Sequence, residues 1–470
     1  MKSFLTVICL FLFFSHVRAQ SAYELIKKEH EPADLKKDID FVRKRLESEH
    51  PSLYWYIDKL TLDKKFDSLK NTITKPLKSV DFNSKVLSVL SSIGDGHLNL
   101  IIDGSRLTEA DIAKYDTKLV PPIYQLEYKV IDHKLYIANN LSKDKTIEPG
   151  TEILSIDNQP ASDLIDALAD CIPSDGFNKT FKYFMLSSGQ LPYIHRSVYG
   201  WRDSLSIKLK HNNITRTAVL KTYPREEIAN NTNSAVVEEL KFLTPDNSVA
   251  YFGIGTFFNN GRTEYGYNNV FKAIKDNKST TLILDLRGNL GGDYHRTANL
   301  FTYFIDTPTY FVKRPTQIIK NAILPSLNKL RRLQMSFLKA NGALYPLGPN
   351  PDAFKGKLYV LINGGSFSST SLLAGSLQSI GKAVFIGEET GGGRNRWTAG
   401  YFKNEELPTS KLTLKYGIIP FEFTNQSEVN GRGVMPDVAI KYTIEDYLAK
   451  KDLELEWVLK EIEKQQSVQK

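Results

Sequence analysis

The sequence predicts a multi-domain α/β protein whose largest part is a mainly parallel sheet covered by helices. The chain has 470 residues, enough for about three domains. Three short apolar runs are each followed by a Gly-rich turn and an expected helix, a pattern typical of parallel sheets. These runs are TLILDL (281–286), KLYVLIN (357–363) and KAVFIG (382–387). The content of 41% hydrophobic and 24% charged residues is that of a globular protein, which excludes a disordered chain or a coiled-coil rod.

Residues 1–19 have the features of a secretory signal peptide. An apolar run from Phe4 to Phe14 follows Lys2, and Val17-Arg18-Ala19 places small residues where a signal peptidase cleaves. An uncleaved membrane anchor is the weaker interpretation, because the run is shorter than the ~20 residues that a span needs. We therefore expect cleavage after Ala19, secretion into a periplasm or the extracellular space, and no stable membrane anchor.

Residues 20–118 are expected to form a helical region. Its first apolar stripe, at three- and four-residue spacing before Pro51, consists of Leu35, Ile39, Val42 and Leu46. A second helix is expected to start near Asp81, an N-cap candidate. Its apolar face consists of Val86, Leu87 and Leu90. That helix should end in SIGDGHLNL, where Gly94 and Gly96 interrupt it.

The rest of the chain divides into three further parts. Residues 119–225 predict a compact β-rich domain with one helix, because YKVIDHKLYIA alternates and EPGTEILSIDNQPASDLIDAL reads as turn, strand, turn and helix. Residues 245–445 hold the parallel sheet, with SVAYFGIGTF as a further strand, a helix around 270–274 and a helical insertion at about 301–356. Residues 446–470 predict a final helix. The apolar stripe of that helix is Leu455, Val458, Leu459 and Ile462.

Charge and motif content exclude several classes of function. The net charge of +8 is spread thinly, and its densest basic stretch (329–339) is typical of a solvated helix face. No nucleic-acid partner is expected, since no recognisable binding module with stacking aromatics is present. The sequence lacks an HExxH motif, a Cys pair in the mature chain, a phosphate-binding loop and a GxGxxG after the first strand. We therefore expect no metal and no cofactor.

A nucleophile pattern remains. In LYVLINGGSFSSTSLLAGSL, a glycine-flanked serine turn lies between a buried strand and a helix, where a hydroxyl is exposed and backbone N–H groups point at an oxyanion. The same run could also be only a Ser/Thr-rich helix cap. DLRGNLGG (285–292) is a second glycine loop after a buried strand. Because such loops meet at one edge of a parallel sheet, the two should form a cleft.

These motifs resemble a known family. IGDGHLNL, DLRGNLGG, INGGSFSSTSLLAG, IGEETGGG and GVMPDV resemble, in this order, the tail-specific or C-terminal-processing serine peptidases, and EPGTEILSIDNQPAS resembles part of their PDZ domain. The resemblance implies a ClpP/crotonase-like catalytic core at 245–445, a PDZ-like domain at 119–225 and a helical N-terminal region. It also implies peptide or unfolded protein substrates.

The resemblance identifies Ser368 as the nucleophile, with Ser366 and Ser371 as flanking residues, in the frame set by Asn363 and Ala374-Gly375. Ser371 departs from the glutamate that the family usually has at this position. The oxyanion donors it implies are the backbone N–H of Ser369 and that of Gly291 or Gly292.

The expected catalytic base differs from the lysine that the processing peptidases use. Their lysine position is Gly393 in TGGGR, and the adjacent Arg394 keeps its proton at neutral pH. The related tricorn-protease core takes a histidine from the segment before its PDZ domain, which here is His97. A neutral imidazole can accept a serine proton, so the chain is placed closer to the Ser–His branch.

A histidine base usually needs an acid that fixes its tautomer. The tricorn branch takes a Glu from before its GVxPD motif, and Glu428 is the nearest match. Its spacing is not a clean fit, and a surface carboxylate in a loop is an equally good interpretation. Asp95, Glu388 and Glu389 are the alternatives.

The expected function is that of a secreted serine endopeptidase with Ser368 as nucleophile, His97 as base and a PDZ-like domain that binds peptide by strand addition. The alternative is a non-catalytic binding protein, because photoreceptor retinoid-binding modules resemble the same fold and bind apolar ligands. An esterase of α/β-hydrolase type is excluded by the order of residues, since the last histidine, His295, precedes Ser368.

Overall fold

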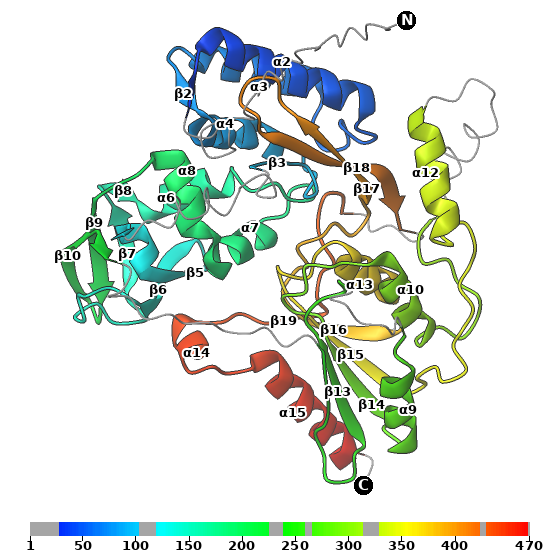
Figure 1. Ribbon diagram of the computed structural model, residues 1–470. Coiled ribbons are helices and arrows are strands. Elements are labelled where there is room, and N and C mark those ends of the chain that lie inside the picture. Colours follow the sequence, from blue (N-terminus) through cyan, green and yellow to red (C-terminus); the bar gives the residue numbers. More distant parts are fainter. Residues whose placement is uncertain are drawn as a thin grey trace, which may run out of the picture.

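The computed structural model describes residues 28–102, 119–224, 238–258, 266–313, 329–423 and 429–468. The predicted signal peptide and Glu428 lie outside these residues. The described part has a helical region on top, a β-rich unit on one side and a sheet covered by helices on the other (Figure 1). This is the α/β multi-domain fold that the sequence predicts. Within the described ranges, no helix is long and apolar enough to cross a membrane.

The N-terminal region consists of three main helices and short strands. Its elements are β1 (Glu29–His30), α2 (Pro32–Glu49), α3 (Lys59–Thr72), β2 (Leu77–Lys78), α4 (Ser79–Ser91) and β3 (Asn99–Ile101). The four apolar residues predicted for α2 are all fully buried. Helix α4 begins at Ser79 with Lys78 as its N-cap, so the predicted cap Asp81 instead lies in the first turn. It ends before Gly94, as predicted.

The middle unit is built on a sheet in the order β10-β9-β7-β6-β5. Its strands are β4 (Leu119–Val120), β5 (Leu126–Ile131), β6 (Lys134–Asn140), β7 (Glu152–Ile156), β8 (Gln159–Pro160), β9 (Ser204–His211), β10 (Ile214–Lys221) and β11 (Tyr223–Pro224). Its helical segments are η2 (Pro122–Gln125), α6 (Ala161–Ala169), α7 (Thr180–Met185), η3 (Leu186–Gln190) and α8 (Leu191–Tyr199). The prediction of a single helix was therefore wrong, because the segment between α6 and β9 is also helical.

The C-terminal half, residues 238–468, includes the part expected to be the catalytic core and is called the catalytic half below. It contains a six-stranded sheet in the order β12-β13-β14-β15-β16-β19, parallel except for β12. Its strands are β12 (Glu238–Phe242), β13 (Val249–Ile254), β14 (Thr281–Asp285), β15 (Lys357–Ile362), β16 (Ala383–Gly387) and β19 (Val438–Ala439). The helices are α9 (Asn268–Asp276), α10 (Tyr294–Thr302), α12 (Lys329–Ala340), α13 (Ser369–Ser379), α14 (Ile444–Leu448) and α15 (Leu453–Val468).

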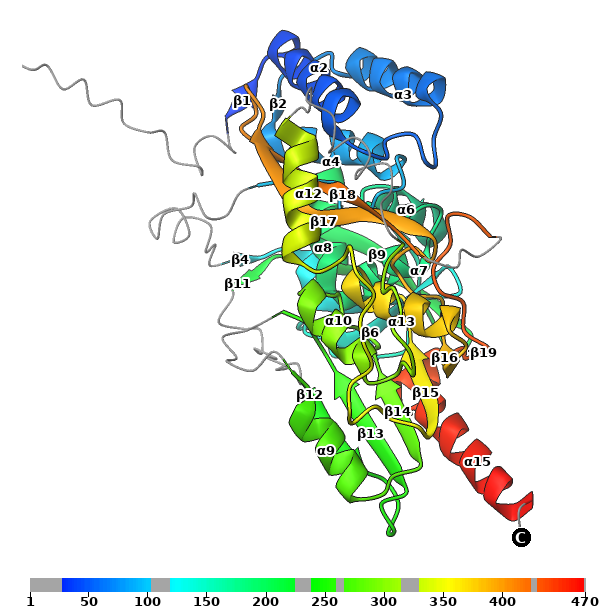
Figure 2. The ribbon, with the colours of Figure 1, turned by 90° about the vertical axis from the view of Figure 1, so that its right-hand side faces the viewer.

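Helices cover both faces of this sheet. Leu282 and Leu284 of β14 pack on the α9 side, whereas Ile283 points to the other face and joins a cluster with Val458 and Ile462 of α15. Figure 2 shows α9 and α15 on opposite sides of the strands. The sheet is therefore buried on both faces, as its continuous apolar runs predict.

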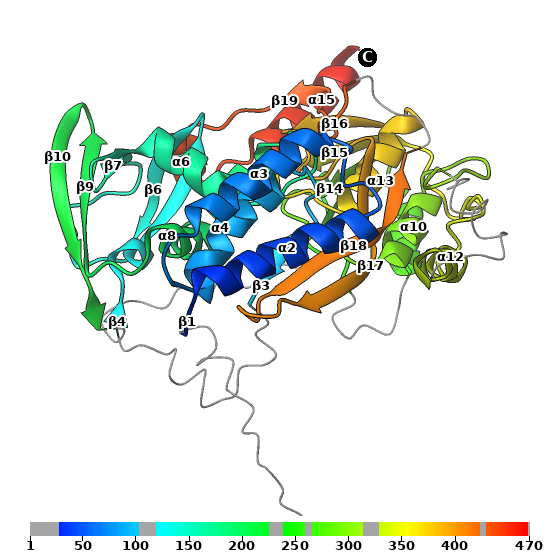
Figure 3. The same ribbon diagram turned by 90° about the horizontal axis from the view of Figure 1, so that it is seen from above.

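One expectation for this half needs correction. Strand β16 is not followed by a helix: the glycine turn after it leads into β17 (Arg396–Glu406), which pairs with β18 (Thr413–Glu422). In the expected helical insertion 301–356, the described part contains α12 as its one helix beyond the end of α10. The β17–β18 ribbon reaches the N-terminal helices, where β3 pairs with β18 (Figure 3).

Candidate active site

Ser368 lies at the turn between β15 and α13. Its backbone has φ 56° and ψ −126°, a conformation that costs a non-glycine residue roughly 1–3 kcal/mol. Sharp strand-to-helix turns of this kind expose a nucleophilic hydroxyl. The flanking hydroxyls are engaged within the turn: Ser366 donates to the carbonyl of Leu286 at 2.8 Å and Ser371 to that of Ser368 at 2.7 Å.

His97 reaches the same point from the loop between α4 and β3. Its Nε2 lies 2.9 Å from Oγ of Ser368, although 271 residues separate the two in sequence. The imidazole packs against Phe367, Trp397 and Phe402, with ring centroids 4.8, 5.5 and 5.9 Å away. Burial lowers the pKa of His97 to about 4, so the ring is neutral at neutral pH and can accept a proton.

The predicted oxyanion donors surround the serine turn. Gly291 has φ 96°, and a Cβ there would lie 2.7 Å from Cβ of Ser368, so only glycine fits. Its N–H, however, donates to Oδ1 of Asn289 at 2.9 Å and is not available to a substrate. Among the described residues no acceptor is found for the N–H of Gly292 or Ser369. The Ser369 hydroxyl joins the two loops by donating to the Gly292 carbonyl at 3.1 Å.

The lysine position of the processing peptidases carries no base in this chain. The N–H of Gly393 donates to Oδ2 of Asp175 at 2.9 Å. Arg394 points away from the site, with its Nε donating to Gln378 and its guanidinium 5.3 Å from the ring of Phe423. Within the described ranges, the side chain that hydrogen-bonds Oγ of Ser368 is the imidazole of His97.

Glu428, the residue that the resemblance matches to the acid, lies outside the described residues. Nδ1 of His97 is buried and has no hydrogen-bond partner in the described part of the chain. Two of the other carboxylates considered as the acid lie away from Nδ1. Glu389 forms an ion pair with Arg432, and Glu388 lines a separate cavity.

Two buried carboxyl groups lie beside His97, and sequence patterns singled out only one of them. Asp95 accepts the His97 backbone N–H at 2.8 Å, and Nε2 of His50 lies 2.9 Å from its other oxygen. Oxygens of Asp95 and Asp175 and a ring nitrogen of His97 lie within 4.8 Å of one another, a spacing at which a metal could bind. Because Asp175 accepts two backbone N–H groups, and Asp95 another, the arrangement is that of a hydrogen-bonded network.

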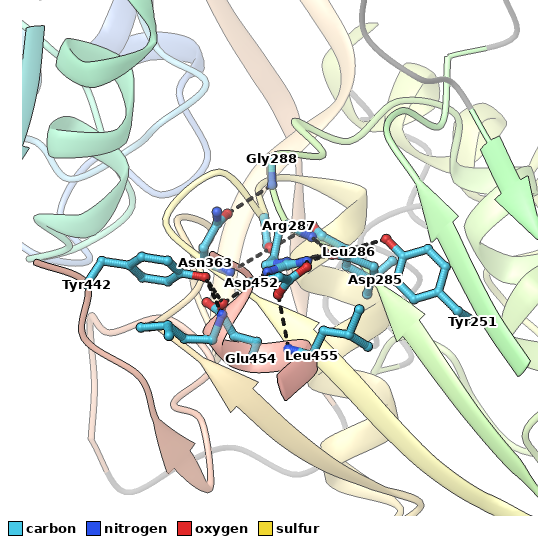
Figure 4. A network of polar contacts seen from close by, with 12 residues as sticks. Tyr251, Asp285, Leu286, Arg287, Gly288, Asn363, Tyr442, Asp452, Glu454 and Leu455 are labelled. Atoms are coloured by element: carbon cyan, nitrogen blue, oxygen red, sulfur yellow. Dashed lines mark hydrogen bonds and ion pairs between the residues drawn. The ribbon is translucent and has the colours of Figure 1, made fainter. Parts of the chain in front are cut away.

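Ion pairs of Arg287 stabilise the glycine loop 285–292. Its guanidinium binds Asp285 at 2.6 Å, Asp452 at 2.8 Å and Glu454 at 3.0 Å, which ties the end of β14 to the start of α15 (Figure 4). One residue further on, the N–H of Gly288 donates to Oδ1 of Asn363, which joins the glycine loop to the serine turn.

The chain is similar to one family model and to several solved structures. Residues 248–440 match the model described as Peptidase family S41. The structure of mature CPAF is 14% identical, with 89% of this chain and 94% of that chain covered and a TM-score of 0.58. Mature CPAF complexed with lactacystin is 13% identical over 89% and 97%, with a TM-score of 0.57. The photosystem II D1 C-terminal processing protease is 14% identical over 87% and 93%, with a TM-score of 0.43. No curated protein matches significantly.

The matched segment contains the strained serine, the glycine loop and the parallel sheet. The protein is a peptidase, a hydrolase whose substrates are peptides or proteins. Residues 248–440 match the model of peptidase family S41, so the resemblance to this family that was drawn from the ordered motifs is confirmed. At this identity the CPAF structures show a shared fold.

Proposed function

We propose that the protein is a secreted serine endopeptidase with Ser368 as nucleophile and His97 as general base. The observation that supports this best is the 2.9 Å contact between Oγ and Nε2 at a strained turn inside the family S41 segment. The lowered pKa of His97 agrees with it, because the imidazole must be neutral to take the serine proton.

In the proposed reaction, Oγ of Ser368 attacks the peptide carbonyl carbon while its proton passes to Nε2 of His97. The N–H groups of Gly292 and Ser369 bind the oxyanion. The tetrahedral intermediate collapses when the leaving amine takes the proton from Nε2, which leaves an ester on Ser368. A water molecule, deprotonated by His97, then hydrolyses this ester, and the serine regains its proton.

Glu428 remains the proposed partner of Nδ1 on His97. Support for an additional acceptor comes from the buried Nδ1 atom, which has no partner in the described part of the chain. An unpaired polar atom at such a place costs roughly 1–3 kcal/mol, so a hydrogen-bond acceptor for Nδ1 would be stabilising. Glu428→Gln should slow acylation while leaving probe affinity unchanged. Parent-like acylation would remove Glu428 from the mechanism.

Covalent labelling tests the Ser–His pair directly. An alkyl fluorophosphonate should add once to the parent, as seen by intact mass, and should add neither to Ser368→Ala nor, at a comparable rate, to His97→Ala. Ser371→Ala is the matched control and should still be labelled, because its hydroxyl only donates to a backbone carbonyl. An unlabelled parent that is correctly folded would favour the non-catalytic binding protein of the same fold.

We also propose that the middle unit binds substrate peptide as a PDZ-like domain. A cavity of about 1170 Å³ lies between the β5–β6 hairpin, α7, the ends of the core strands and the C-terminal segment. Lys129 and Tyr447 line it, whereas Ser368 and His97 do not, which fits a recognition site apart from the chemistry. The outer edge of β5 is occupied, since the Val130 N–H donates to Oγ of Ser187 at 3.0 Å. Strand addition there would require η3 to move.

Peptide binding to Ser368→Ala tests this second role. Fluorescence anisotropy of a labelled peptide with a free C-terminal carboxylate should show binding that weakens with Lys129→Ala, because the ammonium group lines the cavity. Lys275→Ala, which removes an exposed lysine of α9, is the control. Equal binding to all three proteins would place the peptide elsewhere.

Secretion is proposed from the signal peptide at residues 1–19. The intact mass of the exported protein should correspond to a chain that starts at Gln20. A mass that includes Met1 would contradict cleavage.

A further inference from the structure

The segment 174–178 of the middle unit runs between the loop that carries His97 and the catalytic half. At its centre, the carboxyl group of Asp175 accepts the N–H of Gly96 at 2.8 Å and that of Gly393 at 2.9 Å. Its side chain is almost completely buried. One carboxyl group therefore bridges a residue next to the base and a residue of the loop after β16.

The backbone around Asp175 makes parallel contacts to the same two regions. The N–H of Gly176 donates to the carbonyl of Gly94, and that of Phe177 donates to the carbonyl of Gly431, both at 2.8 Å. Gly176 has φ 58°, and a Cβ there would lie only 2.4 Å from Cα of Gly431. The segment 174–178 therefore packs tightly between the loops that contain Gly94 and Gly431, and it limits how far these loops can move apart.

The loop on the catalytic side lies directly against the nucleophile. A Cβ on Gly392, the neighbour of Gly393, would lie 3.0 Å from the backbone nitrogen of Ser368. If the loop that contains Gly96 moved relative to the loop that contains Gly393, the distance between Oγ of Ser368 and Nε2 of His97 would change. Misplacement of reacting groups by about 1 Å can cost roughly 100-fold in rate.

We infer that Asp175 is a positioning residue for the peptidase reaction, which holds His97 at hydrogen-bond distance from Ser368 by bridging the Gly96 and Gly393 amides. This inference rests on the Ser–His mechanism proposed above. Asp175 lies in the middle unit, outside the segment 248–440 that matches the peptidase family. The site is therefore assembled from three separate parts of the chain.

The charge state of Asp175 is compatible with a residue that positions His97 rather than one that changes its charge. Burial, and then the neighbouring Asp95, raise the pKa of Asp175 to about 7. Near neutral pH its carboxyl group therefore holds a proton part of the time. A partly neutral Asp175 can accept both backbone hydrogen bonds and does little to favour protonation of His97.

The test is Asp175→Asn, which keeps the volume but turns one acceptor into an NH₂ group that faces a backbone N–H. With a fluorophosphonate probe, the maximal inactivation rate constant should fall by roughly 10- to 100-fold, while the half-saturating probe concentration changes by less than about twofold. Asp170→Asn makes the same chemical change at an exposed position five residues earlier and should behave as the parent.

A double-mutant cycle separates positioning from general structural support. In the His97→Ala background, residual labelling over long incubation should be the same with and without Asp175→Asn, because the effect is transmitted through His97. A further slowing there would overturn the inference. If Asp175→Asn does not fold, Asp175→Glu, which keeps both acceptors but displaces them, should slow labelling of the folded protein in the same way.

The two proposals can fail separately. If His97→Ala is labelled as fast as the parent, the Ser–His mechanism itself is wrong. If His97→Ala is slow but folded Asp175→Asn is labelled at the parent rate, only the positioning role is overturned.

Discussion

At the residue scale, Ser368 and His97 each adopt a state that a stable core would avoid. Ser368 has a positive φ without being glycine, and His97 keeps a polar ring among three aromatic side chains. Both features bear on reactivity: the turn exposes Oγ, and the aromatic surroundings keep the imidazole neutral. Sites where local rules are broken in this way are where function is expected.

The buried state of His97 predicts an unusual pH dependence. Burial lowers its pKa from 6.5 to about 4, and only the neutral ring accepts the Ser368 proton. The labelling rate should therefore stay high as the pH falls past 6.5 and drop as it falls through about 4. Phe402→Ser, which admits water beside the ring, should move this midpoint upward. Rates measured across the acid range check both statements.

The matched control is Tyr345→Ser, which removes an exposed aromatic ring and should leave the midpoint unchanged. A parent midpoint near 6.5 would mean that water reaches the imidazole freely.

At the element scale, sequence patterns located the strands of the main sheet well. Continuous apolar runs identified β13 to β16 because both faces of this sheet are covered. The β17–β18 ribbon was missed, since a bulge between Ala399 and Phe402 breaks the alternation and Pro420 argues against a strand. The helices after α6 were also missed.

The site itself could be predicted only in part. Ser368 and His97 lie in short motifs with glycine neighbours, which is why the sequence predicts both as site residues, and in the structure their side chains lie 2.9 Å apart. Asp175 lies in no such motif, and its contacts to Gly96 and Gly393 span 79 and 218 residues. The engagement of the Gly291 N–H by Asn289 likewise depends on a side-chain rotamer that no sequence pattern reports.

Substitution of Arg287 tests how strongly its ion pairs hold the end of β14 to the start of α15. Arg287→Ala would leave the buried carboxyl groups of Asp285 and Glu454 without their cation, which typically costs about 3–5 kcal/mol. Urea unfolding should show a loss of this size. Lys275→Ala, which removes an exposed ion pair with Asp352, should cost no more than about 1 kcal/mol. Equal effects would mean that the Arg287 network is solvated.

At the scale of the whole molecule, the hydrophobic cores do not follow the divisions expected from the sequence. Apolar residues of the N-terminal helices and of the catalytic half form one continuous cluster, which includes Leu46 and Leu284. A second cluster, which includes Ile207, is formed by the middle unit and by Phe367, the residue before Ser368. The loop that carries His97 is therefore anchored, through Ile93 and Leu98, in the same core as helix α13, while most of the middle unit packs in the second cluster.

This division predicts two unfolding transitions with different consequences for the site. Leu46 and Ile207 are both fully buried, so truncation to alanine should cost about 2–5 kcal/mol at either position. By calorimetry, Leu46→Ala should lower the transition of the shared core, and Ile207→Ala that of the middle unit. Because Asp175 belongs to the middle unit, Ile207→Ala should also slow fluorophosphonate labelling at temperatures where the shared core is still folded. Leu60→Ala, at an exposed position of α3, should change neither transition. If both core variants lowered one common transition, the three parts would instead fold as a single cooperative unit, and loss of labelling would coincide with global unfolding in each.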